Sequence, residues 1–261
     1  MNTRSVSDTW ERGSPYEQYI GRWSRRVAPL FLSWLDLEPD KIWLDVGCGT
    51  GALCAAIFDL CAPADVIGVE PSEGFLKLAS QNLAGGATLH VGSAAAIPLS
   101  ASSVDAVVSG LVLNFVPDVP AALAEMRRVS KPGGAIAAYV WDYEDQMDLI
   151  RIFWDAAVAL DEGARQLHEG FRFPICSSAA LRAAFEGAGL SNIEVTALNA
   201  VADFASFEEY WRPFLGGQGP APAYAMSLAE DQRSRLRDAI RGQLPTEGNG
   251  SITLDTRAWG I

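Results

Sequence analysis

Residues 44–51 read Leu-Asp-Val-Gly-Cys-Gly-Thr-Gly, an acidic residue followed by three closely spaced glycines. Glycines in this pattern permit a tight turn and let a ligand approach the backbone without meeting a Cβ atom. The N–H groups at the start of the following helix favour a negative ligand group. In open α/β sheets, such ligands bind at the carboxyl ends of the strands. The segment predicts a small-molecule nucleotide site that includes Asp45, Gly47, Cys48, Gly49, Thr50 and Gly51.

The glycine spacing limits which nucleotide this site accepts. No Gly-Lys-Ser/Thr follows the glycines, which excludes a P-loop. The dinucleotide fingerprint is Gly-x-Gly-x-x-Gly, whereas the third glycine here comes one residue early, at Gly51. Asp45 would also repel a pyrophosphate, although it suits a zwitterion that carries an ammonium group. An NAD-dependent oxidoreductase is therefore a less favoured alternative.

A second acidic residue, Glu70, ends the next apolar run, Val66-Ile67-Gly68-Val69-Glu70. A carboxylate at this place in a nucleotide-binding sheet accepts hydrogen bonds from ribose hydroxyls. A lone glutamate at a strand end is usually a solvated charge. Together with the glycine loop, Glu70 predicts ribose binding.

Short apolar runs alternate with helix-like stretches in the segment that must position these residues. The runs span 41–46, 65–70, 87–91, 104–109 and 135–141, and the helices are expected at 51–60, 73–82 and 120–130. The runs are continuously apolar, which is typical of parallel strands buried on both faces. The succession predicts a doubly wound α/β fold with right-handed crossovers.

The flanking segments have a different character. Apolar residues recur at helical spacing in 15–36, and further helices are expected at 142–168, 177–188 and 227–242, with strands at 192–198 and 252–259. We interpret the chain as a single domain over 1–261. It would comprise N-terminal helices at 15–36, a cofactor-binding core at 41–141 and lid segments at 142–176 and 203–249.

The ordered motifs resemble those of class I S-adenosylmethionine-dependent methyltransferases, in particular the ubiquinone/menaquinone-biosynthesis type. Residues 44–51 match the first motif of that family at every position, and 69–72, Val-Glu-Pro-Ser, are similar to its acidic second motif. Residues 91–98, 104–109 and 126–134 resemble the segments that follow, and the last of these ends in Lys-Pro-Gly-Gly. The resemblance spans about 41–141. It implies a seven-stranded, mostly parallel Rossmann-like sheet whose last strand is antiparallel, and S-adenosylmethionine as the cofactor.

The same resemblance assigns further cofactor contacts. They are Pro71, Ser72, Ser93, Ala94, Gly110, Leu111 and Phe115. Arg22 would bind the methionine carboxylate through a bidentate contact, and Tyr16 would add a hydroxyl. The structural alternative for this pair is a surface arginine and a core tyrosine.

Two departures from the family pattern bear on catalysis. Ser93 stands where the family often has an aspartate next to the adenine, and Asn114-Phe115 replaces a frequent His-His pair. An asparagine cannot act as a general base at neutral pH. His168 is the only distinctive candidate for a base, and we expect it to be an exposed helix residue instead. No catalytic residue is therefore assigned, and methyl transfer is expected to depend mainly on positioning.

Aromatic residues in the expected lid indicate an apolar or aromatic small-molecule acceptor. The predicted contacts are Trp141, Tyr143, Phe171 and Trp211, although aromatic residues at helical spacing are more often core. Because no dedicated catalytic residue is visible, a non-catalytic protein that binds S-adenosylmethionine is a second alternative.

The composition excludes several classes of partner. A net charge of −12 opposes binding to nucleic acid, and the arginines at 22–26 and at 127–128 are expected to form solvated faces. The four cysteines and two histidines lack metal-site spacing. No apolar run reaches the roughly 18 residues of a membrane span. The polar first residues lack a signal-peptide core, so a cytoplasmic location is expected.

Overall fold

The structure is a computed structural model, and it describes residues 21–217 and 219–261 of the chain. Contacts between Cα atoms divide the chain into two compact units. We call one of them the sheet unit, which contains residues 24–140, 175–198 and 258–261. The other, the helical unit, contains the described residues of 21–23, 141–174 and 199–257. Tyr16 lies outside the described residues.

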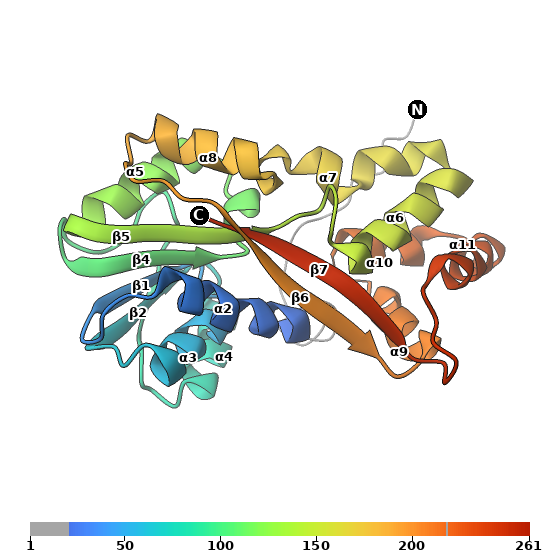
Figure 1. Ribbon diagram of the computed structural model, residues 1–261, viewed down its shortest axis with the longest axis horizontal. Helices are drawn as coiled ribbons and strands as arrows, with labels where there is room; N and C mark the ends of the chain where they lie inside the picture. The colour runs from blue at the N-terminus through green and yellow to red at the C-terminus, as the bar shows by residue number, and fades with distance from the viewer. Residues whose placement is uncertain (1–20, 218) are drawn as a thin grey trace. The chain divides into compact units, whose positions relative to one another are not determined.

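In the part of the chain that the structure describes, seven strands form one sheet in the order β3-β2-β1-β4-β5-β7-β6 (Figure 1). Their bounds are β1 Ile42–Val46, β2 Asp65–Glu70, β3 Thr88–Val91, β4 Val104–Gly110, β5 Ser130–Trp141, β6 Thr196–Phe204 and β7 Ile252–Gly260. The pairs formed among β1 to β5 are parallel. Ala138 and Ile261 exchange two backbone hydrogen bonds of 2.9 Å, the antiparallel pattern that joins β5 to the end of β7. The predicted seven-stranded, mostly parallel sheet with an antiparallel last strand is confirmed.

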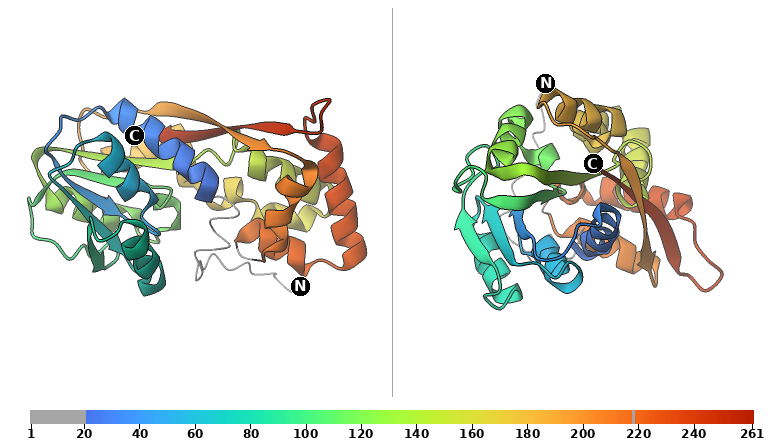
Figure 2. Two further views of the ribbon diagram at one scale, coloured as in Figure 1. Left: turned by 90° about the horizontal axis from the view of Figure 1, so that it is seen from below. Right: turned by 60° about the vertical axis from the view of Figure 1, so that its left-hand side comes forward.

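Helices cover both faces of the strands in the sheet unit. Figures 1 and 2 show α5 and α8 on one face and α2, α3 and α4 on the other. Their bounds are α2 Arg22–Leu35, α3 Ala52–Leu60, α4 Glu73–Asn82, α5 Val119–Val129 and α8 Ser178–Gly187, with 3₁₀ turns at η2 Leu113–Phe115 and η4 Pro174–Cys176. This double cover explains why β1 and β4 are mostly apolar and almost fully buried.

Local capping residues set several helix starts. Ser72 accepts a hydrogen bond from the N–H of Phe75 at the start of α4. Asp118 does the same for the N–H of Ala121 at the start of α5, where a proline occupies the first turn. Serine and aspartate are favoured N-caps because they satisfy N–H groups that have no partner within the helix. These caps place the loops that follow β2 and β4.

The helical unit is built around α6 Asp148–Leu160. Its other elements are η3 Glu162–Leu167, α7 Glu169–Arg172, α9 Phe207–Trp211, η5 Arg212–Leu215, α10 Pro220–Ser227 and α11 Glu230–Gln243. The rings of Phe153 and Phe214 stack with centroids 4.7 Å apart, and the hydroxyl of the buried Tyr210 donates to the carbonyl of Leu149 at 3.0 Å. Much of the aromatic content of the expected lid segments is therefore core of this unit.

Two sequence expectations about the later elements change. The strand expected at 192–198 is found at Thr196–Phe204, because in β6 buried and exposed side chains alternate rather than forming a continuous apolar run. The described residues of the Gly/Pro-rich stretch at 203–249 form three α-helices instead of one. Within the ranges that the structure describes, no helix combines the length and apolarity needed to cross a bilayer.

Candidate functional site

The glycine loop joins β1 to α3 and is fixed by hydrogen bonds from two sides. The backbone N–H groups of Gly47 and Cys48 both donate to the carbonyl of Val69, at 2.7 and 3.1 Å. The side chain of Asn82, in α4, donates to the carbonyl of Thr50 at 2.9 Å. The loop is therefore held in place by β2 and α4 before any ligand binds.

Two of the glycines are required for different reasons. Gly47 has a φ of 78°, and a Cβ atom there would lie 2.5 Å from Cγ1 of Val112. Gly49 has a φ of 52°, but among the described residues a Cβ atom there would meet no atom closer than the carbonyl oxygen of Gly47 at 4.0 Å. Packing thus requires glycine at position 47, whereas Gly49 faces open space through which a ligand can approach the backbone.

Glu70 lies at the carboxyl end of β2 and is 7% exposed. Its Oε2 accepts a hydrogen bond from the N–H of Gly49 at 3.2 Å, and its Oε1 accepts one from the N–H of Ser72 at 3.0 Å. Burial raises the pKa of the carboxyl group, and the two backbone hydrogen bonds oppose that shift. Each carboxylate oxygen keeps a further acceptor position. The group therefore fits two ribose hydroxyls.

Asp45, in β1, is 1% exposed. The thiol of Cys54 donates to its Oδ2 at 3.3 Å, while Oδ1 is buried with no hydrogen-bond partner among the described residues. Burial raises the pKa of Asp45 to about 7, the charge of Glu70 adds to this shift, and the hydrogen bond from Cys54 opposes it. A buried acceptor without a partner is rare in native proteins. It fits a ligand that brings a positive charge or a donor to this position.

The raised pKa of Asp45 predicts a pH dependence of folding. The folded protein retains this proton up to a pH of about 7, whereas the unfolded carboxyl group loses it near its ordinary pKa of 3.8. Between these values the folded state binds more protons, so its stability falls as the pH rises. Relative to Asp45→Asn, wild type should lose about 1 kcal/mol of unfolding free energy per pH unit across this window. Urea unfolding of both proteins at several pH values measures the difference, and a constant difference would contradict the assignment.

The other predicted cofactor residues of the sheet unit lie after β2, β3 and β4. Pro71 and Ser72 link β2 to α4, and Ser93 and Ala94 follow β3. Gly110 ends β4, Leu111 has a φ of 61°, and Phe115 closes η2 with a ring that is 37% exposed. Because β1 to β4 are parallel, these residues and the glycine loop share the carboxyl edge of the sheet.

Asn114 also lies at this edge, and sequence reasoning considered it only as a missing base. Its Nδ2 is buried and has no hydrogen-bond partner in the part of the chain that the structure describes. A buried amide donor without a partner is costly unless a ligand accepts from it. Asn114 can therefore donate a hydrogen bond to a ligand, although it cannot take up a proton. Asn114 lies four residues past the end of β4, and this position could have identified it from the sequence as a candidate ligand contact.

Arg22 belongs to the helical unit, and its guanidinium is only partly paired. Nη1 donates to Oε1 of Glu209 at 2.7 Å, and the group lies over the ring of Trp23 at 4.2 Å. Nε and Nη2 are buried, with no acceptor among the described residues. The expectation of a solvated arginine face is therefore wrong for Arg22. Its two remaining donors match the two oxygens of a carboxylate.

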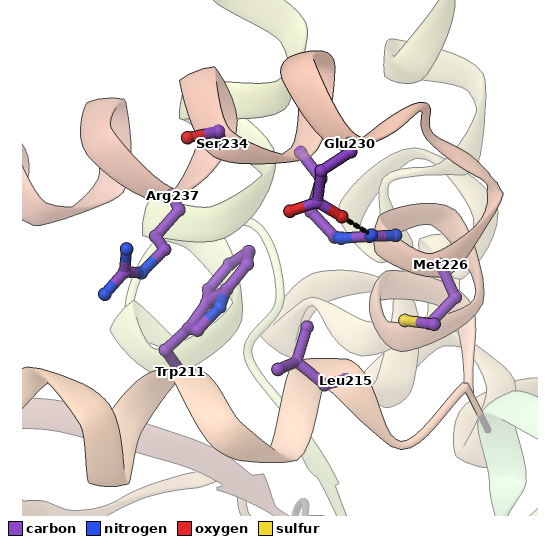
Figure 3. A pocket seen from close by; sticks show the side chains of 7 residues that line it. Trp211, Leu215, Met226, Glu230, Ser234 and Arg237 are labelled. Atoms are coloured by element: carbon purple, nitrogen blue, oxygen red, sulfur yellow. Dashed lines mark hydrogen bonds and ion pairs between the residues drawn. The ribbon is translucent and has the colours of Figure 1, made fainter.

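The predicted acceptor residues also belong to the helical unit, and their exposures differ. Trp141 and Tyr143 are buried, whereas the ring of Phe171 is 59% exposed. Trp211 lines a pocket of about 300 Å³ (Figure 3). The other lining residues are Leu215, Met226, Glu230, Arg233, Ser234 and Arg237. Figure 3 shows Trp211 and Leu215 pointing from one wall toward Glu230 on the other, where Glu230 pairs with Arg233.

His168 is not the exposed helix residue expected from the sequence, since it is only 8% exposed. Its ring stacks on Trp154, and its Nδ1 accepts a hydrogen bond from the N–H of Gly170 at 2.9 Å, which caps α7. Burial lowers the pKa of the imidazole. These contacts explain His168 as a capping residue of the helical unit.

Comparison with known proteins relates the glycine loop and the strands around it to one family. Residues 44–138 match the family described as "Methyltransferase domain". This match covers the end of β1, all of β2 to β4 and most of β5, and with them every predicted cofactor residue of the sheet unit.

Two curated relatives illustrate the range of similar proteins. The chain is 34% identical over 120 residues to a demethylmenaquinone methyltransferase of Symbiobacterium thermophilum, covering 44% of this chain and 47% of the relative. It is 30% identical over 136 residues to a malonyl-[acyl-carrier protein] O-methyltransferase of Serratia marcescens, covering 52% of each. The chain therefore spans about half the length of each relative.

The fold extends beyond the matched segment. A crystal structure of a proposed methyltransferase from Bacillus halodurans superposes with a TM-score of 0.59, covering 90% of this chain and 96% of the other. The two sequences are only 15% identical, so the likeness concerns the fold alone.

Proposed function

We propose that this chain, whose residues 44–138 match the family described as "Methyltransferase domain", transfers a methyl group from S-adenosylmethionine to a small-molecule acceptor. The observation that carries the proposal is Glu70, a buried carboxylate held by the N–H groups of Gly49 and Ser72 at the carboxyl end of β2. The acceptors named in the two relatives, a demethylmenaquinone and a malonyl-[acyl-carrier protein], support an acceptor other than nucleic acid.

The residues of this chain fit S-adenosylmethionine in three respects. Glu70 would accept hydrogen bonds from the ribose hydroxyls, and the open face of Gly49 would let the ligand reach the loop backbone. Asp45 would favour the positively charged end of the cofactor. When bound, the cofactor supplies a methyl group that its sulfonium already activates.

The role of the protein in transfer would then be to position the acceptor. Asn114 can hold an acceptor atom by donating a hydrogen bond but cannot remove its proton, and Nδ1 of His168 is engaged in capping α7. Alignment of the nucleophile at near-attack distance can itself supply much of a rate enhancement. We therefore propose an acceptor that needs no strong base, such as an amine, a thiol or a stabilised carbanion.

The experiment that tests the function is acceptor-dependent formation of S-adenosylhomocysteine. The purified chain is incubated with S-adenosylmethionine labelled in its methyl group and with panels of amines, thiols, hydroxyquinones and carboxylic acids. We expect S-adenosylhomocysteine to form in the presence of at least one panel, and the methyl label to appear in an acceptor of that panel. Tight binding of S-adenosylmethionine without transfer to any panel would instead favour the non-catalytic alternative.

We also propose that the pocket containing Trp211 receives the apolar part of the acceptor. Leu215 and Met226 line it and are 44% and 46% exposed, so replacing them should leave the fold intact. Leu215→Gln and Met226→Gln should each raise the KM for the acceptor about tenfold, because a buried polar amide costs roughly 1–3 kcal/mol. Affinity for S-adenosylmethionine should not change.

Steady-state kinetics with the acceptor found in the panels measures this effect. Leu60→Gln is the matched control, because Leu60 is 56% exposed at the end of α3 and is not among the residues lining this pocket. If all three variants keep the wild-type KM for the acceptor, the acceptor binds elsewhere.

A further inference from the structure

The segment that follows β3 is clamped by two charged residues of α5. Nη1 of Arg128 donates to the carbonyl of Leu99 and Nη2 to the carbonyl of Ile97, both at 2.8 Å. Glu125 accepts from the N–H of Ile97 at 2.9 Å. Glu125 also pairs with Arg128 through both carboxylate oxygens, at 2.6 and 2.7 Å. Three backbone groups of one short segment are thus bound by one ion pair.

The clamped segment begins beside the ribose-binding residue. The N–H of Gly92 donates to the carbonyl of Glu70 at 3.2 Å, and the chain then turns so that the N–H of Ala96 reaches the carbonyl of Ser93 at 3.0 Å. A Cβ atom at Gly92 would lie 2.8 Å from Cδ of Pro98, so the segment folds back closely on its own start. The turn that carries Ser93 and Ala94 is therefore anchored at one end by β2 and at the other by α5.

Arg128, expected from the sequence to lie on a solvated face, is 36% exposed but also binds the backbone carbonyls of Ile97 and Leu99. We propose that Arg128 is a positioning residue for the adenine ring of the cofactor and acts through Ile97 and Leu99 on the turn that contains Ser93 and Ala94. The proposal rests on the proposed function, because it assumes that a ribose at Glu70 directs its base toward the neighbouring turn after β3.

Only a guanidinium fits this arrangement. Its fork binds both oxygens of Glu125 while Nη1 and Nη2 remain available to the two carbonyls, which no other side chain can reproduce. Residues that orient a ligand contact from behind typically change affinity by about tenfold to a hundredfold when replaced. Loss of the fork would free the turn without touching Glu70 or the glycine loop.

The test compares two homocysteine nucleosides that differ only in the base. S-adenosylhomocysteine and S-inosylhomocysteine are titrated calorimetrically into wild type, Arg128→Gln and Arg127→Gln. Arg127 is the matched control, because it is the next residue of α5 and its Nη1 donates to the carbonyl of Ala188 instead. Wild type and Arg127→Gln should prefer the adenosyl ligand. Arg128→Gln should bind the adenosyl ligand about tenfold more weakly and the inosyl ligand nearly as wild type does.

A purely structural role would give a different result. Equal weakening of both ligands in Arg128→Gln, or unchanged preference for adenine, would overturn the proposal. Arg128→Lys retains the charge without the fork, so it should show the same loss of preference for the adenosyl ligand. It replaces Arg128→Gln in the test if that variant is too unstable to titrate. Hydrogen exchange of the Ala96 and Ile97 amides in the ligand-free protein should be faster in both variants, and unchanged exchange contradicts the clamp. Absence of binding of either ligand to wild type would defeat the proposed function itself, and the adenine role with it.

Discussion

Replacing Glu70 by alanine is expected to weaken the binding of S-adenosylmethionine about a hundredfold or more, because each hydrogen bond to a charged group contributes about 1.5–3 kcal/mol. The substitution removes the carboxylate and with it the proposed bonds to two ribose hydroxyls. It also removes the hydrogen bonds that Glu70 accepts from the N–H groups of Gly49 and Ser72, which fix the glycine loop to the start of α4. One side chain thus both binds the ligand and shapes the loop that receives it.

Calorimetric titration of wild type and Glu70→Ala measures this loss. Glu73→Ala is the matched control, since Glu73 lies three positions along the chain in the first turn of α4 and is exposed. The control should bind as wild type does. The affinity of Glu70→Gln for S-adenosylmethionine should fall between those of wild type and Glu70→Ala, because its amide oxygen can replace only one of the acceptor oxygens. Undiminished affinity in Glu70→Ala would remove the ribose assignment.

The second large effect is expected from Gly49→Ala, which should weaken S-adenosylmethionine binding about tenfold to a hundredfold, since overpacking costs about 1–3 kcal/mol. Among the described residues, the new methyl group would meet no atom closer than the carbonyl oxygen of Gly47 at 4.0 Å, so its steric cost would arise only with the ligand. The positive φ of 52° at this position adds a folding cost of about 1–2 kcal/mol for any L-residue.

Gly85→Ala separates these two costs. Gly85 has a φ of 77° and a Cβ atom there would meet nothing within 4 Å, but it lies in the turn between α4 and β3. It should show the same loss of unfolding free energy in urea with full affinity for the ligand. Equal affinity of Gly49→Ala and Gly85→Ala would show that the ligand does not approach Gly49.

Most of the sheet could be predicted because its strands carry a strong local pattern. Val66 to Val69 are continuously apolar, and Val104 to Val108 are apolar apart from Asp105, since helices cover both faces of the sheet. The helical unit was less predictable. Trp141, Tyr143 and His168 are buried. Tyr143 lies against the ring of Phe173 and His168 stacks on Trp154, and local spacing does not encode these contacts between residues distant in sequence.

Only part of the candidate site could likewise be predicted from the sequence. Its glycines and Glu70 could be identified from type and spacing alone, because a strand-to-helix turn around a ligand allows few alternatives. The roles of Asn114 and Arg128 could not. An asparagine with a buried, unpartnered Nδ2 and an arginine that spans two carbonyls are recognised only when their surroundings are known. Arg128 was predicted to lie on a solvated face because the sequence does not reveal its contacts with the segment after β3.

The central claim is that the glycine loop and Glu70 bind S-adenosylmethionine rather than a dinucleotide. Calorimetric titration of the wild-type chain with S-adenosylmethionine and, separately, with NAD tests this claim most directly. We expect saturable binding of S-adenosylmethionine at one site per chain and no measurable binding of NAD. Binding of NAD without binding of S-adenosylmethionine would contradict the account and restore the oxidoreductase alternative.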